Sequence, residues 1–96
     1  MDIKDYAFLQ ILFHPSIPIN QTKIEKRVKK GLTIGEALIE TLKESEEAFN
    51  YLVKNEKIRP GFLILNNKIE LKTTGKLGSK IDRDLTIRII PISHGG

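Results

Sequence analysis

The first patterned segment of the chain is an eight-residue run of aromatic and branched residues. Residues 6–13 read YAFLQILF and stop at His14 and Pro15, where the proline disfavours continued regular structure. Both alternating sides of this run are largely apolar, which is typical of a strand with neighbours on both sides. The pattern therefore predicts a central strand at residues 6–13.

Residues 22–30 carry a weaker pattern, in which Ile24 and Val28 share one face and charged residues fill the other. This pattern favours an exposed second strand that pairs with the first strand as a hairpin. A spacing of four residues also fits one side of a short basic helix. The sequence alone leaves both interpretations of residues 22–30 open.

A helix is predicted to begin after Thr33. The segment from Thr33 to Glu36 has the form S/T-x-x-E, in which a hydroxyl and a carboxylate satisfy free amides at a helix start. On a helical wheel eight apolar residues fall in one sector, and mainly charged residues lie opposite. The apolar sector contains Ile34, Ala37, Leu38, Leu42, Ala48, Phe49, Leu52 and Val53. We expect one amphipathic helix whose apolar side is buried against a flat surface.

Beyond residue 60 the sequence predicts three further strands separated by turns. They are an apolar run at 62–65, a short strand at 68–72 after two asparagines, and a last strand at 85–92. Residues 73–80, which include Gly75 and Gly78, are expected to form a loop, and residues 82–84 a polar turn.

These elements predict an α+β protein with the β-grasp, or ubiquitin-like, fold, in which a mixed sheet of about five strands surrounds one main helix. A ferredoxin-like fold needs a second helix of similar length, and only residues 22–30 offer one. With 96 residues the chain is too short for two cores. We expect a β-grasp domain over residues 1–92, followed by a flexible diglycine tail at residues 93–96.

The residue counts exclude several kinds of chemistry. The chain has no cysteine, which excludes disulfides, zinc-thiolate clusters and thiol nucleophiles. His14 and His94 are far apart in the sequence and lack an obvious third ligand, so no metal site is expected. No apolar run approaches the roughly 20 residues of a spanning helix, and the N-terminus does not resemble a secretory signal. These features predict a soluble cytoplasmic protein that binds no membrane.

The net charge of +4 is unevenly distributed, with a basic segment at residues 23–30 and an acidic one at residues 36–47. Basic proteins often bind nucleic acid, but single-stranded RNA is usually recognised by stacking on aromatic residues. The chain has only four Phe and two Tyr, and they do not follow such a pattern. We therefore expect no nucleic acid partner.

The sequence lacks the usual motifs of phosphate-binding, dinucleotide-binding, metalloprotease and serine hydrolase sites. The carboxylates of Glu36, Glu40 and Glu44 have helical spacing on the predicted solvent side, which is typical of a solvated surface. His14, next to a proline, fits a loop residue. We therefore expect no catalytic residues and no enzyme activity in this chain.

The end of the chain offers a different chemistry. Gly95 and Gly96 follow closely on the predicted last strand and carry the free α-carboxylate. Because glycine has no Cβ, this extension can thread a narrow channel, and four extended residues reach roughly 13 to 14 Å. Such a tail is suited to presenting its carboxylate to another enzyme. The alternative is a frayed terminus without a function.

Four motifs occur together in residues 61–96. They are the segment GFLILN at 61–66, a glycine loop at 75–77, an acidic turn at 82–84 and the diglycine at 95–96. In this combination the chain resembles the ubiquitin-like sulfur carriers, which include the molybdopterin synthase small subunit, the thiamine sulfur carrier, the ubiquitin-related modifier and the small archaeal modifiers. His94 makes it most similar to the ubiquitin-related modifiers. Its turn reads Asp82-Arg83-Asp84 where relatives often have Asp-Gly-Asp.

The resemblance implies a two-step use of Gly96. An E1-like adenylating enzyme activates the carboxylate with ATP and magnesium, and a sulfur donor converts the acyl-adenylate to a thiocarboxylate. The sulfur then serves tRNA thiolation or molybdopterin formation, or the activated terminus is joined to lysines of target proteins. The carrier itself is expected to be a monomer without a bound cofactor.

Docking on such partners needs a surface, and alternation along the last strand predicts one on the outer side of the sheet. The expected surface is an apolar partner patch with a basic rim, made of Phe62, Ile64, Arg88, Ile90 and Ile92. His94 either helps to position the tail or is an exposed linker residue.

Two other functions fit the same sequence. One is a β-grasp module that binds RNA or protein through its basic face, with an incidental diglycine terminus. The other is a small subunit that regulates an enzyme by inserting its tail without covalent chemistry.

Overall fold

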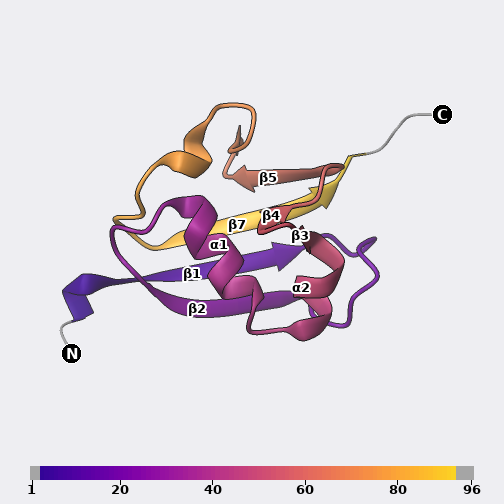
Figure 1. Cartoon of the computed structure of the whole chain (residues 1–96), viewed down its shortest axis with the longest axis horizontal. Helices are drawn as coiled ribbons and strands as arrows, with labels where there is room; N and C mark the ends of the chain where they lie inside the picture. The colour runs from indigo at the N-terminus through magenta and orange to yellow at the C-terminus, as the bar shows by residue number, and fades with distance from the viewer. Residues whose placement is uncertain (1–2, 93–96) are drawn as a thin grey trace.

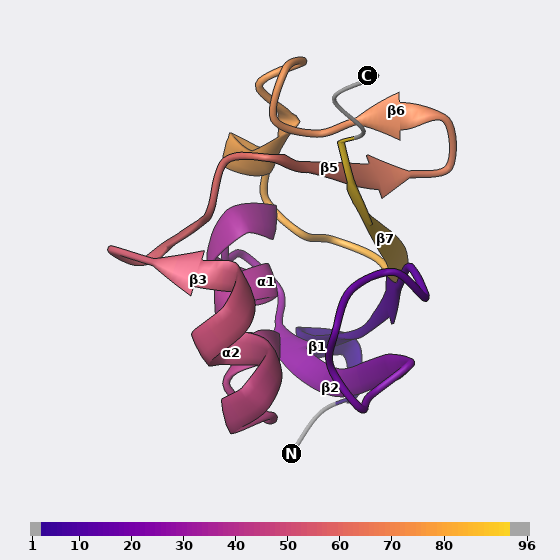
Figure 2. The same cartoon turned by 90° about the vertical axis from the view of Figure 1, so that its right-hand side faces the viewer.

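The computed structural model describes residues 3–92, which form a mixed sheet with two helices on one side (Figure 1). The elements in chain order are η1 (Ile3–Asp5, a 3-10 helix), β1 (Tyr6–Phe13), β2 (Lys23–Lys29), α1 (Ile34–Leu42), α2 (Glu46–Leu52), β3 (Val53–Lys54), β4 (Lys57–Ile58), β5 (Phe62–Asn66), β6 (Ile69–Glu70), η2 (Lys76–Gly78, a 3-10 helix) and β7 (Leu85–Pro91). In the view of Figure 2 the helices cover one face of the sheet and leave the other face open.

The main sheet has the strand order β2-β1-β7-β5-β6. β1 is antiparallel to β2 and parallel to β7, whereas β5 is antiparallel to both β7 and β6. The first strand of the chain is therefore an interior strand, as its two apolar sides predicted. A mixed five-stranded sheet packed against helices confirms the expected β-grasp fold.

Residues 23–29 form a strand, β2, and not the alternative basic helix. Ile24 lies opposite Ile11 in the register with β1, and Val28 lies opposite Ala7. All four of these side chains are buried. The alternation of β2 therefore places its two apolar residues in the core and leaves most of its charged residues in solvent.

The predicted single helix is wrong in one respect, because two short helices take its place. α1 begins at the predicted capping box, where the Glu36 amide donates to Thr33 Oγ1 at 3.0 Å and the Thr33 amide to Glu36 Oε1 at 2.9 Å. These hydrogen bonds hold the pKa of Glu36 below its usual value. α2 begins anew at Ser45, whose hydroxyl caps the Ala48 amide at 3.2 Å. Val53, predicted in the helix, belongs to β3.

The core lies between the sheet and the helices. It is built from alternate residues of the strands and one side of each helix, with a few loop residues. The buried hydrophobic residues are Ala7, Leu9, Ile11, Phe13, Ile17, Ile24, Val28, Ala37, Leu38, Leu42, Ala48, Leu52, Phe62, Ile64, Leu71, Ile81, Ile87 and Ile89. In residues 3–92, no helix has the length and apolar character needed to cross a membrane.

Glu70 holds the loop after β6 against β5. Its Oε2 accepts a hydrogen bond from the Ile64 amide at 2.9 Å, and its Oε1 accepts one from the Thr73 amide at 2.6 Å. Burial raises the pKa of Glu70, but the hydrogen bonds outweigh burial and hold that pKa below the usual 4.5. The carboxylate thus satisfies a backbone donor at the edge of β5 that faces away from β7.

Candidate functional site

The expected reacting group belongs to a segment that follows β7 in the sequence. His94, Gly95 and Gly96, which carry the expected tail chemistry, lie outside the described residues. The last described backbone hydrogen bond before them joins the Ile92 amide to the Gly61 carbonyl at 2.8 Å. The described part of the chain therefore ends beside Gly61, the residue that precedes β5.

β7 is an interior strand, held on both sides. Ile89 pairs with Phe13 of β1 and with Ile64 of β5. The His14 amide extends this ladder by donating to the Ile89 carbonyl at 3.0 Å. Interior strands are the least able to shift or fray, since their backbone groups are paired along both edges. The pairing with β1 ends at Ile89, so the last residues of β7, Ile90 and Pro91, are held by β5 alone.

The outer side of β7 carries the predicted partner residues Arg88, Ile90 and Ile92. Arg88 is exposed, Ile90 is half-buried, and Ile92 has 40% of its surface exposed. Ile87 and Ile89, which alternate with them, are fully buried under the helices. The predicted outward orientation of these three residues agrees with the structure, and their role in binding a partner stays a prediction.

Phe62 and Ile64 do not belong to the outer face, so their predicted place in the partner patch is wrong. Phe62 is 9% exposed and Ile64 is fully buried. In the register between β5 and β7, Ile64 lies opposite the buried Ile89, and Leu63 lies opposite Ile90. Residues directly opposite one another in a sheet share a face, so Leu63 takes the outward position beside Ile90.

Two leucines complete this surface. Leu12 of β1 and Leu65 of β5 both lie opposite Arg88, one on each side of β7, and both are half-buried. We call the surface the outer patch, and define it as Leu12, Leu63, Leu65, Ile90 and Ile92 around Arg88. A small hollow of about 100 Å³ lies at its edge, lined in part by Leu12, His14 and Ile90. The patch leads directly to the start of the tail.

A charged strip borders the outer patch along β2. Lys23 lies opposite Leu12 and Arg27 lies opposite Phe8, and both cations are exposed. Glu25 lies between them, with one carboxylate oxygen 3.7 Å from the Lys23 ammonium and the other accepting a hydrogen bond from the Gln10 amide group at 3.2 Å. The strip therefore gives the apolar surface a net basic border, as the sequence predicted.

The remaining titratable residues singled out in the sequence occupy ordinary surface positions. Glu36 caps α1, Glu40 is exposed, and Glu44 pairs with Lys26 at 3.1 Å. His14 lies in the exposed loop after β1, where its Nδ1 accepts the Ser16 amide at 3.1 Å. Within the described part of the chain, no group of three or more His, Cys, Asp or Glu side chains is placed to hold a metal ion.

Comparison with known proteins agrees with this architecture. The family model Urm1 (Ubiquitin related modifier) matches residues 7–96. The chain is similar in structure to the Haloferax volcanii HVO 2177 protein, with a TM-score of 0.72, 21% identity and coverage of 100% of this chain and 92% of that chain. It is also similar to the small archaeal modifier protein 1 from Methanosarcina acetivorans, with a TM-score of 0.67, 14% identity, and coverage of 95% and 98% respectively. No curated protein matches the chain.

Proposed function

Because the chain belongs to the Urm1 family of ubiquitin-related modifiers, we propose that it is a sulfur carrier and protein modifier whose reacting group is the α-carboxylate of Gly96. The family match is the observation that carries this proposal, since it extends over the diglycine at residues 95–96. The firmly paired β7 and the outer patch beside it support the proposal, because a partner can hold that face while the tail enters its active site.

The first step activates the carboxylate. An E1-like adenylating enzyme brings ATP and magnesium, and a Gly96 carboxylate oxygen attacks the α-phosphorus of ATP. A bond forms between that oxygen and phosphorus, and pyrophosphate leaves. The carboxylate is a poor electrophile before this step, because its oxygen is a poor leaving group. AMP is a good leaving group, so the acyl-adenylate can react with nucleophiles.

The second step depends on the nucleophile. A sulfur donor at the oxidation level of sulfide attacks the acyl carbon, displaces AMP and leaves a terminal thiocarboxylate. The sulfur passes from there to tRNA thiolation or to molybdopterin formation. If the ε-amine of a target lysine displaces the activating group instead, an amide joins Gly96 to the target protein. In both branches the carrier supplies the electrophile and its partners supply the catalytic groups.

We also propose that the carrier works as a monomer in the cytoplasm. A thiocarboxylate and its sulfur donors persist in a reducing compartment. The chain has no cysteine, so it forms none of the disulfides that are typical of proteins in oxidising compartments. The outer patch docks the adenylating enzyme. Its apolar residues give the contact area and Arg88, with the border along β2, gives orientation by charge.

The proposal is tested by reconstitution. The full chain, without a C-terminal tag, is incubated with the adenylating enzyme of its own host, ATP, magnesium and sulfide, and its intact mass is measured. We expect a mass increase equal to the replacement of one oxygen by sulfur, located by fragmentation at Gly96. An unchanged mass, while the enzyme demonstrably forms acyl-adenylate on another carrier, would overturn the proposal.

A further inference from the structure

A hollow of about 540 Å³ shares no residue with the outer patch and differs from it in composition. Its lining residues come from the β3–β4 hairpin, the segment before β5 and the residues that follow β6. They are Lys54, Asn55, Lys57, Ile58, Arg59, Pro60 and Lys72. Four of these side chains are cationic and none is acidic. The volume lies within the roughly 300 to 1,000 Å³ typical of pockets for small ligands.

The hairpin places two of these cations directly opposite each other. Asn55 and Glu56 have positive φ angles of 52° and 62°, which is the geometry of a two-residue type I′ turn. In the resulting register Lys54 pairs with Lys57, and both side chains are exposed. Like charges at directly opposite positions destabilise a sheet. The hairpin therefore carries a cost in stability that a bound anion would remove.

Within residues 3–92, no acidic side chain forms an ion pair with Lys54, Lys57, Arg59 or Lys72. Arg59 is held in place by a hydrogen bond of 3.3 Å from Nη1 to the carbonyl of Tyr51. Its guanidinium has five N–H donors in all, so this bond uses a minority of them.

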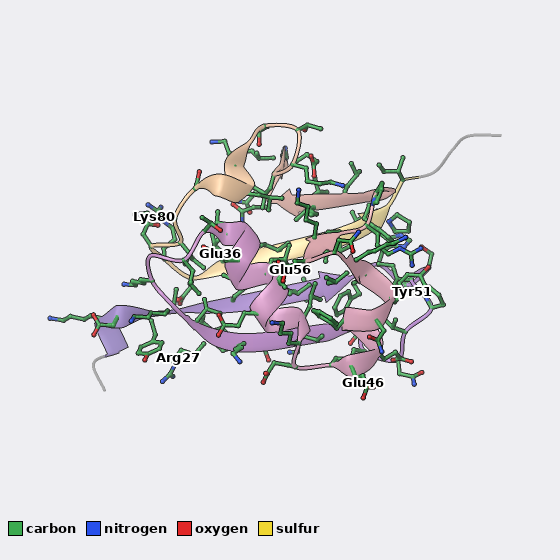
Figure 3. The ribbon with its side chains drawn as sticks, viewed as in Figure 1. Arg27, Glu36, Glu46, Tyr51, Glu56 and Lys80 are labelled. Carbon is green, nitrogen blue, oxygen red and sulfur yellow. The ribbon has the colours of Figure 1, made fainter. Side chains whose placement is uncertain are left out.

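A second, apolar pocket of about 260 Å³ continues the hollow towards α1. The two share Lys57, Ile58 and Lys72, and the second is further lined by Gly35, Leu38, Ile39, Glu56 and Leu77. Gly35 faces Leu77 closely, since a Cβ added at Gly35 would lie 3.4 Å from the Leu77 carbonyl oxygen. Glu56, labelled in Figure 3, also lines this second pocket, so the two pockets together contain one acidic side chain beside their four cations.

Four cations beside an apolar pocket favour some anions over others as ligands. Four cations around one small hollow match a compact group with several negative charges, whereas the carboxylates of an acidic peptide carry one charge each and lie further apart. An extended phosphate backbone would satisfy the cations, but it has no use for a narrow apolar pocket at one end. A polyphosphate attached to a flat, largely apolar ring system uses both parts.

We propose that these two pockets, which we call the nucleotide groove, bind a nucleoside triphosphate. The polyphosphate lies against Lys54, Lys57, Arg59 and Lys72, and the base lies between Ile39 and Leu77. The groove shares no residue with the outer patch. The inference therefore goes beyond the proposed sulfur chemistry and does not depend on it.

The test is a binding titration of the isolated full chain, followed by amide NMR, with ATP, tripolyphosphate and adenosine as separate ligands. We expect ATP to produce saturable shifts at residues 54–59 and 72, and also at residues 35–39 and 77. Tripolyphosphate should shift the first group alone. ATP should bind at least about tenfold more tightly than adenosine, because the charge-assisted hydrogen bonds come from the phosphates.

Matched variants separate the groove from the general basic charge. The double variant Lys54→Gln/Lys57→Gln should weaken ATP binding at least about tenfold. The double variant Lys23→Gln/Lys29→Gln removes the same net charge from β2 and should leave the ATP affinity within about twofold. Ile39→Gln should weaken binding of ATP but not of tripolyphosphate. Amide spectra without ligand confirm that each variant is folded.

Three results would overturn the proposal. The first is the absence of saturable shifts with ATP at millimolar concentration. The second is an equal loss of affinity in the two double variants, which would indicate diffuse charge attraction. The third is tighter binding of hexaglutamate or of an RNA oligonucleotide than of ATP at the same residues, which would make the groove a docking site for an acidic segment or a nucleic acid. None of these results affects the mass assay for the tail, so failure of the groove and failure of the sulfur chemistry are distinguishable.

Discussion

The Ile92 amide donates a hydrogen bond of 2.8 Å to the Gly61 carbonyl. β7 pairs with β1 up to Ile89 and with β5 up to Pro91, so this bond extends the pairing on the β5 side to the last described residue. Four residues in extended conformation reach roughly 13 to 14 Å. We therefore expect the number of tail residues to limit how far the reacting carboxylate can lie from the outer patch.

Deletion of Gly96 tests whether the length of the tail sets the position of the reacting carboxylate. The carboxylate then moves back by about 3.5 Å, whereas reacting atoms must approach within about 3 to 3.5 Å of one another. We expect adenylation to fall at least about a hundredfold, measured as enzyme-dependent ATP–pyrophosphate exchange. The melting temperature should stay within a few degrees of wild type, because the change is far from the core. Exchange at the wild-type rate would show that the tail length is not decisive.

Gly95→Val tests the width of the channel with the tail length unchanged. A branched Cβ fixes χ1 and enlarges the cross-section of the tail, but it leaves the carboxylate in register. We expect the exchange rate to fall strongly while the binding of the folded domain to the enzyme is retained. Ser93→Ala, at the other end of the tail, serves as the control and should react normally. Full activity of Gly95→Val would exclude a narrow channel.

Ile90→Asp tests the outer patch. The new carboxylate would be desolvated in the contact with the adenylating enzyme, at a cost of about 1 to 3 kcal/mol. We expect about a tenfold or larger increase in Kd by calorimetry, with a folded amide spectrum. Asn50→Asp, an exposed position on α2, adds the same charge on the opposite side and should leave Kd unchanged. Unaltered affinity of Ile90→Asp would remove the patch from the docking surface.

The Glu70 carboxylate predicts a specific loss of stability in acid. Its pKa is lower in the folded protein than in the unfolded chain, so its contribution is present above about pH 4.5 and is lost as the pH falls through the folded pKa. Glu70→Gln should lower the free energy of unfolding at pH 7 by about 1 kcal/mol, and the difference should shrink at pH 3. Urea unfolding at both pH values measures this. Glu40→Gln, on an exposed side chain, is the control, and an equal pH dependence in both variants would contradict the assignment.

Lys54 and Lys57 lie opposite each other, and we expect this pair to lower the stability of the fold while it favours ATP binding. Lys57→Glu replaces a like-charge pair by an opposite-charge pair and should raise the free energy of unfolding by about 0.5 kcal/mol. The same variant should lose ATP binding in the nucleotide groove. Lys68→Glu, an exposed change of equal charge, should leave both nearly unaltered. A destabilised Lys57→Glu would show that the two cations do not repel in the folded hairpin.

Local patterns in the sequence were sufficient for most elements of this fold. The capping box from Thr33 to Glu36 and the apolar run at residues 6–13 depend on neighbours in the sequence, and the structure places a helix start and an interior strand there. The break at residues 43–45 was missed because the apolar residues on both sides of it, among them Leu42, Ala48 and Leu52, fall within one broad sector of a helical wheel, and all three are buried. A second cap at Ser45 was the signal that could have revealed it.

The candidate site was harder to predict, because it depends on which face each strand residue occupies. Residues 62–65 are all apolar, so alternation within the segment does not determine its inward side. Pairing with β7 determines it, by placing Leu63 opposite Ile90 and Ile64 opposite Ile89. The nucleotide groove was missed for a related reason. Strands of two residues at 53–54 and 57–58 are too short for a periodic pattern, although Asn55 is a residue typical of such turns.

The most direct measurement of the central claim is the intact mass of the protein purified from its native host without a C-terminal tag. If the chain carries sulfur, a fraction of the molecules should have one oxygen replaced by sulfur, and a thiol-alkylating reagent should add a single group to that fraction, at Gly96. The cysteine-free sequence offers the reagent no other thiol. A population whose terminus is entirely a carboxylate, from cells grown under sulfur-replete conditions with active tRNA thiolation and molybdopterin synthesis, would contradict the carrier function.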